Sequence, residues 1–316
     1  MVESNLVMDL PLMNSYQYIT QYPDRTITIL GITFEQFNEL SKQAITSAME
    51  CQNQTEQQKQ RVNKKGAGSS KSLSSIEEIC LTLFYLRQPC TFEVLGMQFD
   101  VSRTTANDRF HYWIKFIRAL LPASLMEEVV DPSHLSELQS ILQEQELIVD
   151  SFEQERSRPL DNQEQEDCYS GKKARHTFKN QVISLPKGTD IVDVLSGERG
   201  PEADITLMRK RLSLFNEEQN FLADKAYEGE VQILTPKKKP RGGKLTSVEK
   251  EQNRTLSKRR VYIEHVIRRL RIFGILQGRF RLRSRCYQQV MLTVCGLSRL
   301  RMGTFQFDDF SQRKSW

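Results

Sequence analysis

The stretch Leu147-Ile148-Val149-Asp150-Ser151 decides how the second half of this 316-residue chain folds. Its three aliphatic residues predict a short strand, from Leu147 to Asp150, that is buried on both faces within a mixed or parallel sheet. The strand is expected to end on the carboxylate, where the chain turns polar. Carboxylates are seldom buried without a partner, and functional groups gather where central strands emerge. Asp150 is therefore a candidate functional residue, with a helix or turn cap as the alternative.

The sequence that follows predicts an α/β layered domain. Further strands are expected at 177–185, 191–195, 221–224 and 232–235, a helix at 204–215 and a long helix at 248–273. Three strands, a helix, two strands and a long helix is the element order of the ribonuclease-H-like fold. Asp224 is expected to end the fourth strand as Asp150 ends the first. Glu264 is expected in the middle of the long helix.

Residues 73–121 predict an all-α helix-turn-helix domain. Pro89 ends a first apolar helix, Thr91 caps a short second helix, and Ser102 caps a third. The third helix opens with side chains of the types that read base edges and hold phosphates, namely Ser102, Arg103, Thr104, Thr105, Asn107 and Arg109. An ordinary three-helix bundle with a solvated polar face is the alternative. His111 is expected to pack or cap rather than to catalyse.

The remaining segments divide the rest of the chain. Within residues 1–72, a helical N-terminal segment is expected at 1–50, with Thr33 and Gln36 as a capping box, and a flexible basic linker or arm at 51–72. An acidic connector is expected at 122–145, the α/β domain at 146–300 and a tail at 301–316.

Charge is strongly segregated along the chain. Between Leu125 and Asp167 there are 13 acidic and 2 basic residues, whereas between Lys237 and Arg301 there are 19 basic and 3 acidic residues. The basic stretch predicts a polyanionic partner, with nucleic acid as the first candidate. No apolar run is long enough to span a bilayer, no signal peptide is recognisable, and the six cysteines have no zinc-site spacing, so a cytosolic protein with reduced thiols and no membrane partner is expected.

Three carboxylates carry the expected chemistry. Asp150 and Asp224 follow strands, and Glu264 shares one helical stripe with Arg260 and Arg268. Three converging carboxylates would repel one another unless cations bind between them, and hard oxygen ligands select Mg²⁺ or Mn²⁺. Two such ions can activate water or a 3′-hydroxyl against a phosphodiester. For Glu264 alone, a surface Arg–Glu–Arg ladder is the alternative.

These features together resemble a known family, the DDE-type transposases of bacterial insertion sequences, in the IS-five-like branch related to eukaryotic Harbinger transposases. The resemblance covers residues 66 to 300 and rests on the order and spacing of Leu83-Phe84-Tyr85-Leu86-Arg87-Gln88, Val149-Asp150, Arg158-Pro159, Tyr169-Ser170-Gly171-Lys172-Lys173-Ala174-Arg175-His176-Thr177, Ala223-Asp224-Lys225-Ala226-Tyr227, Thr235-Pro236-Lys237-Lys238-Lys239-Pro240, Arg260-Val261-Tyr262-Ile263-Glu264-His265 and Cys295-Gly296-Leu297.

The resemblance implies that Asp150, Asp224 and Glu264 are the catalytic metal ligands, with Asp204 as a further candidate or a helix cap, because Ala203 stands where the family has His. It implies DNA contacts from Lys172, Lys173, Arg175, His176, Lys237, Lys238 and Lys239, and phosphate positioning by Arg260, Arg268 and Arg271. Arg279, Arg281, Arg283 and Arg285 are expected to bind DNA without sequence preference. The chain departs from the family at Ser151-Phe152, where Gly-Thr is usual, at Ser257 and at Arg271.

The expected protein is a transposase that binds the terminal inverted repeats of its own element and uses Mg²⁺ or Mn²⁺, as two ions, for DNA strand cleavage and transfer. Its expected partner is double-stranded DNA. It is expected to act as at least a homodimer on DNA, in the bacterial cytoplasm at the nucleoid. Two alternatives remain, a decayed or domesticated transposase that only binds DNA, and a ribonuclease-H-like nuclease without strand transfer.

Overall fold

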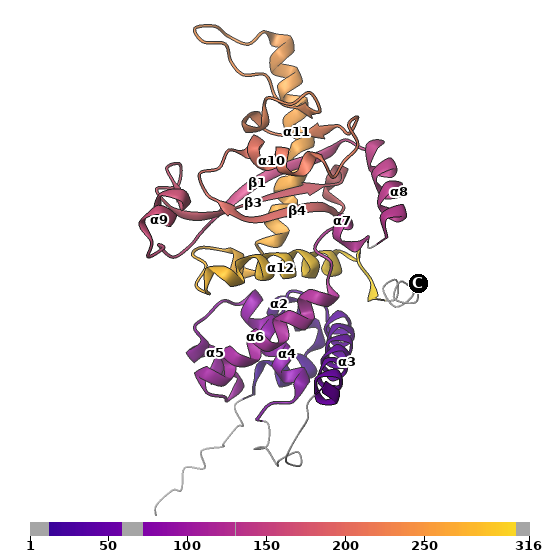
Figure 1. Ribbon diagram of the computed structural model, residues 1–316, viewed down its shortest axis with the longest axis vertical. Helices are drawn as coiled ribbons and strands as arrows, with labels where there is room; N and C mark the ends of the chain where they lie inside the picture. Colours follow the sequence, from indigo (N-terminus) through magenta and orange to yellow (C-terminus); the bar gives the residue numbers. More distant parts are fainter. Residues whose placement is uncertain (1–12, 59–71, 130, 308–316) are drawn as a thin grey trace, which may run out of the picture.

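The computed structural model describes residues 13–58, 72–129 and 131–307. The N-terminal third is helical and the rest is an α/β part, and helix α12 (Tyr287–Met302) lies between the two (Figure 1). The predicted order of an all-α domain followed by an α/β domain is confirmed. In the described ranges, no helix is long and apolar enough to cross a membrane.

Three helices form the predicted helix-turn-helix, α4 (Ser75–Arg87), α5 (Phe92–Phe99) and α6 (Arg103–Leu120). Both predicted caps are present. The Thr91 hydroxyl accepts from the Val94 N–H, and the Ser102 hydroxyl accepts from the Thr105 N–H. Each cap satisfies an N–H that the first turn of a helix leaves without a backbone partner, so the sequence fixes where α5 and α6 begin.

The turn between α5 and α6 depends on a glycine. A Cβ atom on Gly96 would lie 2.5 Å from the carbonyl oxygen of Val101, so only glycine allows this close approach. Asp100 ends α5 in the left-handed conformation with φ 52°, which Asp tolerates better than most residues. On the inner face, the buried Trp113 donates its indole N–H to the buried Glu78 at 2.6 Å, which ties α6 to α4.

The chain before the helix-turn-helix forms α1 (Ser15–Gln21), α2 (Thr26–Ile29) and α3 (Phe34–Gln58). Thr33 and Gln36 form the predicted capping box. The prediction of a linker at 51–72 was wrong for residues 51–58, which continue α3. The Gln-rich sequence there contains no Gly or Pro, and Gln favours a helix once one is nucleated. Residues 59–71 lie outside the described part.

The predicted acidic connector forms α7 (Leu125–Glu128) and α8 (Pro132–Gln143). Asp131 caps α8, and Pro132 occupies its first turn. Leu142 of α8 is buried in the same apolar cluster as Phe215 and Phe221 of the α/β part. The second half of the connector therefore belongs to the core of the α/β part.

The sheet contains β1 (Leu147–Glu155), β2 (Tyr169–Ser170), β3 (Arg175–Ser184), β4 (Ile191–Arg199), β5 (Phe221–Leu222) and β6 (Ile233–Leu234). β1 is central, because it pairs antiparallel with β3 and parallel with β5. β3 also pairs antiparallel with β4 and β2, and β5 pairs parallel with β6. The helices of this part are α9 (Asn162–Cys168), α10 (Asp204–Leu212) and α11 (Ser247–Leu270). The predicted order of strands and helices is present.

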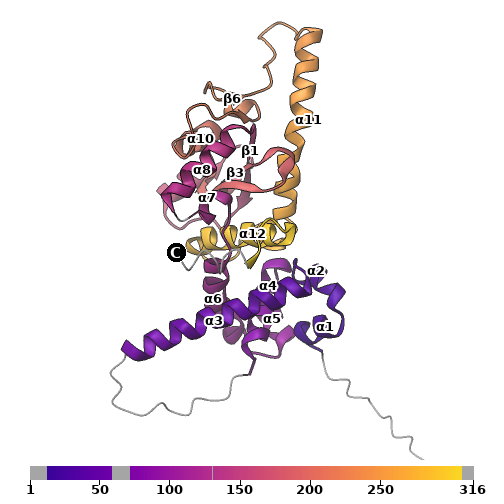
Figure 2. The ribbon, with the colours of Figure 1, turned by 90° about the vertical axis from the view of Figure 1, so that its right-hand side faces the viewer.

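The sheet is covered on both faces (Figure 2). Side chains alternate along β1, as they must in a strand. Leu147 and Val149 pack into the cluster that includes α8 and α10, whereas Ile148 and Phe152 pack into the cluster that includes α11 and α12. Asp150 has the same parity as Ile148 and Phe152. Its side chain therefore faces α11.

Several strand boundaries differ from those predicted: β4, for example, runs to Arg199 rather than ending at 195, and two of the differences concern candidate site residues. β1 does not end at Asp150 but continues to Glu155, because every residue from Ile148 onward has a partner on β3. The polar stretch after Asp150 is tolerated since its buried member, Gln154, donates to the Ile275 carbonyl at 2.8 Å. β5 ends before Asp224, which instead caps the short 3₁₀ helix Lys225–Tyr227.

Helix α12 joins the two parts through a buried arginine. Arg299 is fully buried, and its guanidinium donates to both carboxylate oxygens of Asp190, at 2.8 and 2.9 Å. It also donates to Glu128 at 2.8 Å and to the Pro122 carbonyl at 3.2 Å. One side chain thus ties the turn before β4 to the segment that leaves α6.

Candidate active site

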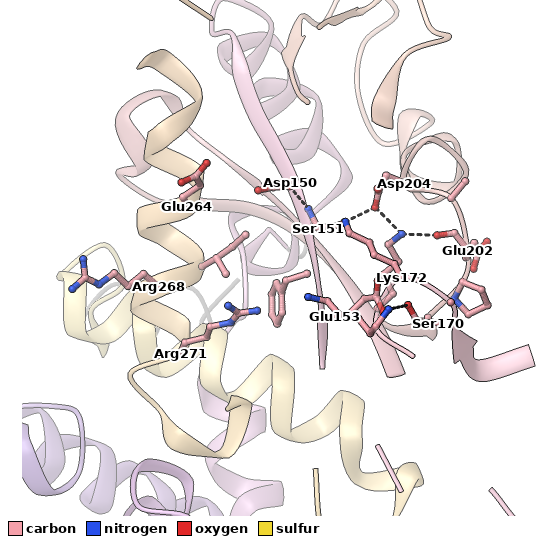
Figure 3. Close-up of a pocket in the computed structure, with 18 residues that line it drawn as sticks. Asp150, Ser151, Glu153, Ser170, Lys172, Glu202, Asp204, Glu264, Arg268 and Arg271 are labelled. Atoms are coloured by element: carbon pink, nitrogen blue, oxygen red, sulfur yellow. Dashed lines mark hydrogen bonds and ion pairs between the residues drawn. The ribbon is translucent and has the colours of Figure 1, made fainter. Parts of the chain in front are cut away.

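A cavity of about 650 Å³ opens between β1, α11 and the start of α10 (Figure 3). Five acidic side chains line it, those of Asp150, Glu153, Glu202, Asp204 and Glu264. Five cationic side chains also line it, those of Lys172, Lys173, Lys179, Arg268 and Arg271. The structure therefore brings two of the three predicted catalytic carboxylates to one cavity with a cationic lining.

Asp150 is the buried carboxylate of this cavity. Burial raises its pKa to about 6, against a model-compound value of 3.8. The backbone N–H of Ser151, which donates to it at 2.8 Å, and the charge of Arg260 lower the pKa, whereas the charges of Asp224 and Asp204 raise it further. Asp150 thus lies within the field of two other carboxylates, those of Asp224 and Asp204.

Asp224 is close enough to influence Asp150 but is not among the described residues that line the cavity. One of its carboxylate oxygens accepts from the Ala226 N–H at 2.8 Å, which fixes the side chain at the end of β5. β5 pairs parallel with β1, and this pairing brings the segment that leads to Asp224 next to the start of β1.

Glu264 lies on α11, on the side of the cavity toward which the Asp150 carboxylate points (Figure 3). Its side chain is 56% exposed and is 3.9 Å from the Arg260 guanidinium, one helical turn earlier. The predicted Arg–Glu stripe therefore exists, and it borders the cavity. Arg268 and Arg271 continue from Glu264 toward the end of α11 and line the same cavity.

Asp204 has a different partner set. The Lys179 ammonium lies 2.8 Å from its carboxylate, and the Ser151 hydroxyl donates to the same oxygen. Lys179 is only 7% exposed and also donates to the Glu202 carbonyl at 2.5 Å. Asp204 is therefore charge-compensated by the protein, and it does not cap α10, whose N-cap is Ala203.

Sequence reasoning missed Lys179. Its signal was a lysine inside a predicted strand next to Phe178, where a buried charged side chain needs a partner. That partner, Asp204, lies on the helix after the next strand, and nothing local in the sequence indicates the pairing.

Two positions that depart from the family pattern contact each other. The Arg271 guanidinium lies over the Phe152 ring, 5.1 Å from its centroid, in a cation–π arrangement. A guanidinium stacks on a ring better than an ammonium does, so Arg at 271 suits Phe at 152. Ser151, the other departure, is the residue whose hydroxyl bonds to Asp204.

The predicted DNA-contacting residues fall into separate groups. Arg175 pairs with Glu155 at 2.5 Å, and together with Lys173 and Arg271 it lines a second cavity beside the first. His176 packs against the Tyr169 ring. The run Lys237–Lys239 is not among the residues that line the site cavity. The Lys237 backbone is hydrogen-bonded to the Asn253 side chain of α11.

On the helix-turn-helix, Arg103, Thr104 and Ser102 are exposed. The Arg109 guanidinium lies 3.6 Å from the carboxylate of the buried Glu78, so Arg109 forms an ion pair within the domain. His111 packs against Phe92 and Phe110, as predicted.

The carboxylates fit a divalent cation in their chemistry, because their hard oxygen donors suit such ions and because a cation would relieve the repulsion at Asp150. Among the described residues, however, no three His, Cys, Asp or Glu side chains are arranged to hold one ion together. The site therefore offers the ligand types without a closed cage.

Comparisons with known proteins identify the family. The chain matches a DDE superfamily endonuclease domain over residues 149–299 and the helix-turn-helix of DDE superfamily endonucleases over residues 71–123. It is 32% identical over 226 residues to a probable transposase for insertion sequence element IS702 from Microchaete diplosiphon, a match that covers 70% of this chain and 79% of that protein. The chain belongs to the DDE transposase family. It is an endonuclease-type transposase with a helix-turn-helix DNA-binding domain, and nucleases of this family generally use divalent metal ions.

Two solved structures of Mos1 also match. A Mos1 transposase paired-end complex with the left transposon end is 10% identical and covers 75% of this chain and 89% of that chain, with a TM-score of 0.19. A pre-cleavage Mos1 transpososome is 10% identical and covers 82% of this chain and 86% of that chain, also with a TM-score of 0.19. A TM-score this low carries no argument about fold or function.

Proposed function

We propose that this transposase binds the terminal inverted repeats of its own element and cleaves and transfers DNA strands there. Asp150, Asp224 and Glu264 would hold Mg²⁺ or Mn²⁺, as two ions. The observation that carries the proposal is the cavity itself, where Asp150 of β1 and Glu264 of α11 meet beside Lys172, Lys173, Arg268 and Arg271. A surface Arg–Glu pair at Glu264 with no other role would not need to border a cavity that also contains Asp150.

The protein groups have distinct tasks in this proposal. Bound divalent ions would supply the Lewis acidity that activates water or a 3′-hydroxyl. Lys172 and Lys173, on one side of the cavity, and Arg268 and Arg271, on α11, would bind the phosphates that flank the scissile bond. Lys179 holds Asp204, which leaves Asp150 as the buried acid available to a cation.

Recognition and assembly complete the proposal. The start of α6, with the exposed Ser102, Arg103 and Thr104 and the partly exposed Thr105 and Asn107, would read the repeat in the major groove. In this proposal the helix-turn-helix domain comprises residues 73–121, and the catalytic domain comprises residues 146–300 together with α8, which packs into its core. Both ends of the element must be held together, so we propose a homodimer or larger assembly on DNA, acting at the nucleoid in the bacterial cytoplasm.

The test is to offer the intact protein three substrates with Mg²⁺ or Mn²⁺: a duplex carrying the element's end, a scrambled duplex of equal length, and an RNA–DNA hybrid. Cleavage at the element's end, followed by joining of its 3′-end to a target duplex, supports the proposal. Tight binding of the end without cleavage would point to a protein that only binds DNA. Preferential cleavage of the hybrid without joining would point to a nuclease of the ribonuclease-H type.

A further inference from the structure

A separate cleft, of about 780 Å³ and distinct from both cavities at the candidate site, lies between the helix-turn-helix domain and the segment before α12. One wall is a stripe on α6, formed by Arg103, Asn107, His111 and Lys115 at intervals of four residues. Side chains at this spacing share one helix face. The opposite wall is formed by Arg281, Arg283 and Arg285, which we call the arginine segment.

The cleft is cationic on both walls. Five of its lining side chains carry a positive charge, and none of the lining residues, all of which lie in the described part of the chain, is a carboxylate. Arg103, Lys115 and the arginine segment are exposed. Like charges that face each other across a cleft are unfavourable unless an anion fills it, so the charge distribution calls for a polyanion.

The two walls interact electrostatically through His111. Its pKa is lowered by partial burial first, and then by the charges of Lys115, Arg283 and Arg285, while Asp108 acts in the opposite direction. Groups on the arginine segment are thus close enough to α6 to affect its side chains. The wall contributed by the catalytic domain and the wall contributed by the recognition helix form one site.

The arginine segment is anchored to the central strand of the catalytic domain. The Phe280 N–H donates to the Glu155 carbonyl at 2.7 Å, so the segment begins as an extension of the ladder of β1. The buried Arg156 guanidinium donates to the Ser284 hydroxyl at 2.9 Å. The Phe280 ring packs edge-on against Tyr287, the first residue of α12. The segment is therefore positioned before any ligand binds.

We infer that this cleft binds the sugar-phosphate backbone of the duplex whose bases α6 reads, so that the arginine segment of the catalytic domain forms half of the DNA-recognition site. The inference rests on the proposed function and deepens it. Phosphate contacts position a protein on DNA and base contacts specify the sequence. The arginine segment would supply position and affinity, and Asn107 on the facing wall would supply sequence preference.

The test measures DNA binding by the full-length protein with fluorescence anisotropy at several salt concentrations. The probes are a duplex of the element's end and a scrambled duplex of the same length. The variant Arg283→Ala/Arg285→Ala removes two charges from the cleft. The matched control, Arg25→Ala/Lys42→Ala, removes two exposed charges from the N-terminal helices.

The arginine-segment variant is expected to bind both duplexes more weakly by the same factor, which preserves the preference for the element's end. Its log–log salt dependence should be shallower by about 1.8, because each phosphate contact contributes about 0.9. Asn107→Ala should lose the preference for the element's end without a change in salt dependence. The control should match the unmodified protein.

A native thiol provides a second readout that does not depend on any variant. Cys286 lines the cleft and is partly exposed, whereas Cys51 on α3 is exposed elsewhere. Bound DNA is expected to slow alkylation of Cys286 by N-ethylmaleimide several-fold and to leave Cys51 unaffected, as measured by mass spectrometry.

Equal affinity and salt dependence in the arginine-segment variant and the control, or unprotected Cys286 in the DNA complex, would overturn the inference. If the unmodified protein still preferred and cleaved the element's end, the proposed function would stand without it. If the unmodified protein showed no such preference, the proposed function would fail, whatever the variants did.

Discussion

Arg299 links the turn before β4 to the segment that follows α6. Replacing it by Met keeps much of the length and apolar volume but removes the guanidinium, which makes two hydrogen bonds to Asp190 and one each to Glu128 and Pro122. Asp190 is 5% exposed, so the variant leaves a buried carboxylate without its cation. Breaking a buried ion pair in this way costs about 3–5 kcal/mol.

For the Arg299–Asp190 pair we expect a cost in the lower half of that range, because Asp190 keeps other hydrogen-bond donors. Its carboxylate keeps two other donors, the Thr304 hydroxyl at 3.0 Å and the Ile191 N–H at 2.7 Å. We therefore expect Arg299→Met to lower the free energy of unfolding by about 3–4 kcal/mol, as measured by urea denaturation of the full-length protein. The double variant Arg299→Met/Asp190→Asn should recover part of the loss, because removing both charges avoids an unpaired one.

A matched control lies two residues further along α12. Arg301 donates to the Gly31 carbonyl at 2.7 Å from a partly exposed position, so Arg301→Met should cost only about 1–2 kcal/mol. A loss below about 1 kcal/mol for Arg299→Met, or a double variant less stable than the single one, would refute the role assigned to Arg299.

Three further predictions concern the site and the recognition domain. Asp150→Asn should stabilise the metal-free protein at pH 7.5 by about 3 kcal/mol. A carboxyl whose pKa is raised in the folded state destabilises that state progressively as pH rises from about 3.8 to about 6. The gain in stability should fall to about half at pH 5, and a gain that does not depend on pH would contradict the burial account. Gly96→Ala should lower the free energy of unfolding by about 2 kcal/mol or more and weaken DNA binding, because the added Cβ would lie 2.5 Å from the Val101 carbonyl oxygen. An unchanged thermal unfolding temperature would show that the turn relaxes freely. DNA binding should tighten as pH falls from 7.5 to 6. In the free protein the pKa of His111 is lowered first by burial and then by the charges of Lys115, Arg283 and Arg285, against the opposing charge of Asp108, and a phosphate opposite His111 would raise it. In His111→Gln this tightening should disappear, and its persistence would mean that another group takes up the proton.

Local signals in the sequence were enough for the helix-turn-helix and for the order of strands. Ser102 and Thr91 mark helix starts because a hydroxyl at that position satisfies a free N–H, which is a property of a few consecutive residues. The aliphatic run at Leu147–Val149 likewise requires burial. Such features place Asp150 and Glu264 on the correct elements without any knowledge of tertiary contacts.

The features that were missed depend on residues far apart in the sequence. β1 continues through a polar stretch because β3 offers it a continuous partner, and Gln154 finds its acceptor at Ile275. Lys179 looks misplaced in a strand until Asp204 is seen beside it. No pattern along the chain indicates that Arg299 would meet Asp190, 109 positions earlier.

The central claim is that Asp150, Asp224 and Glu264 act together as the catalytic carboxylates. It is tested most directly by strand cleavage of an element-end duplex with Mg²⁺ or Mn²⁺, comparing the intact protein with Asp150→Ala, Asp224→Ala and Glu264→Ala. Glu251→Ala is the matched control, since Glu251 also lies on α11 and faces an arginine at 3.9 Å. We predict that cleavage is lost in the three variants and kept in the control, with DNA binding retained in all. Cleavage that survives the loss of Glu264 would contradict the claim.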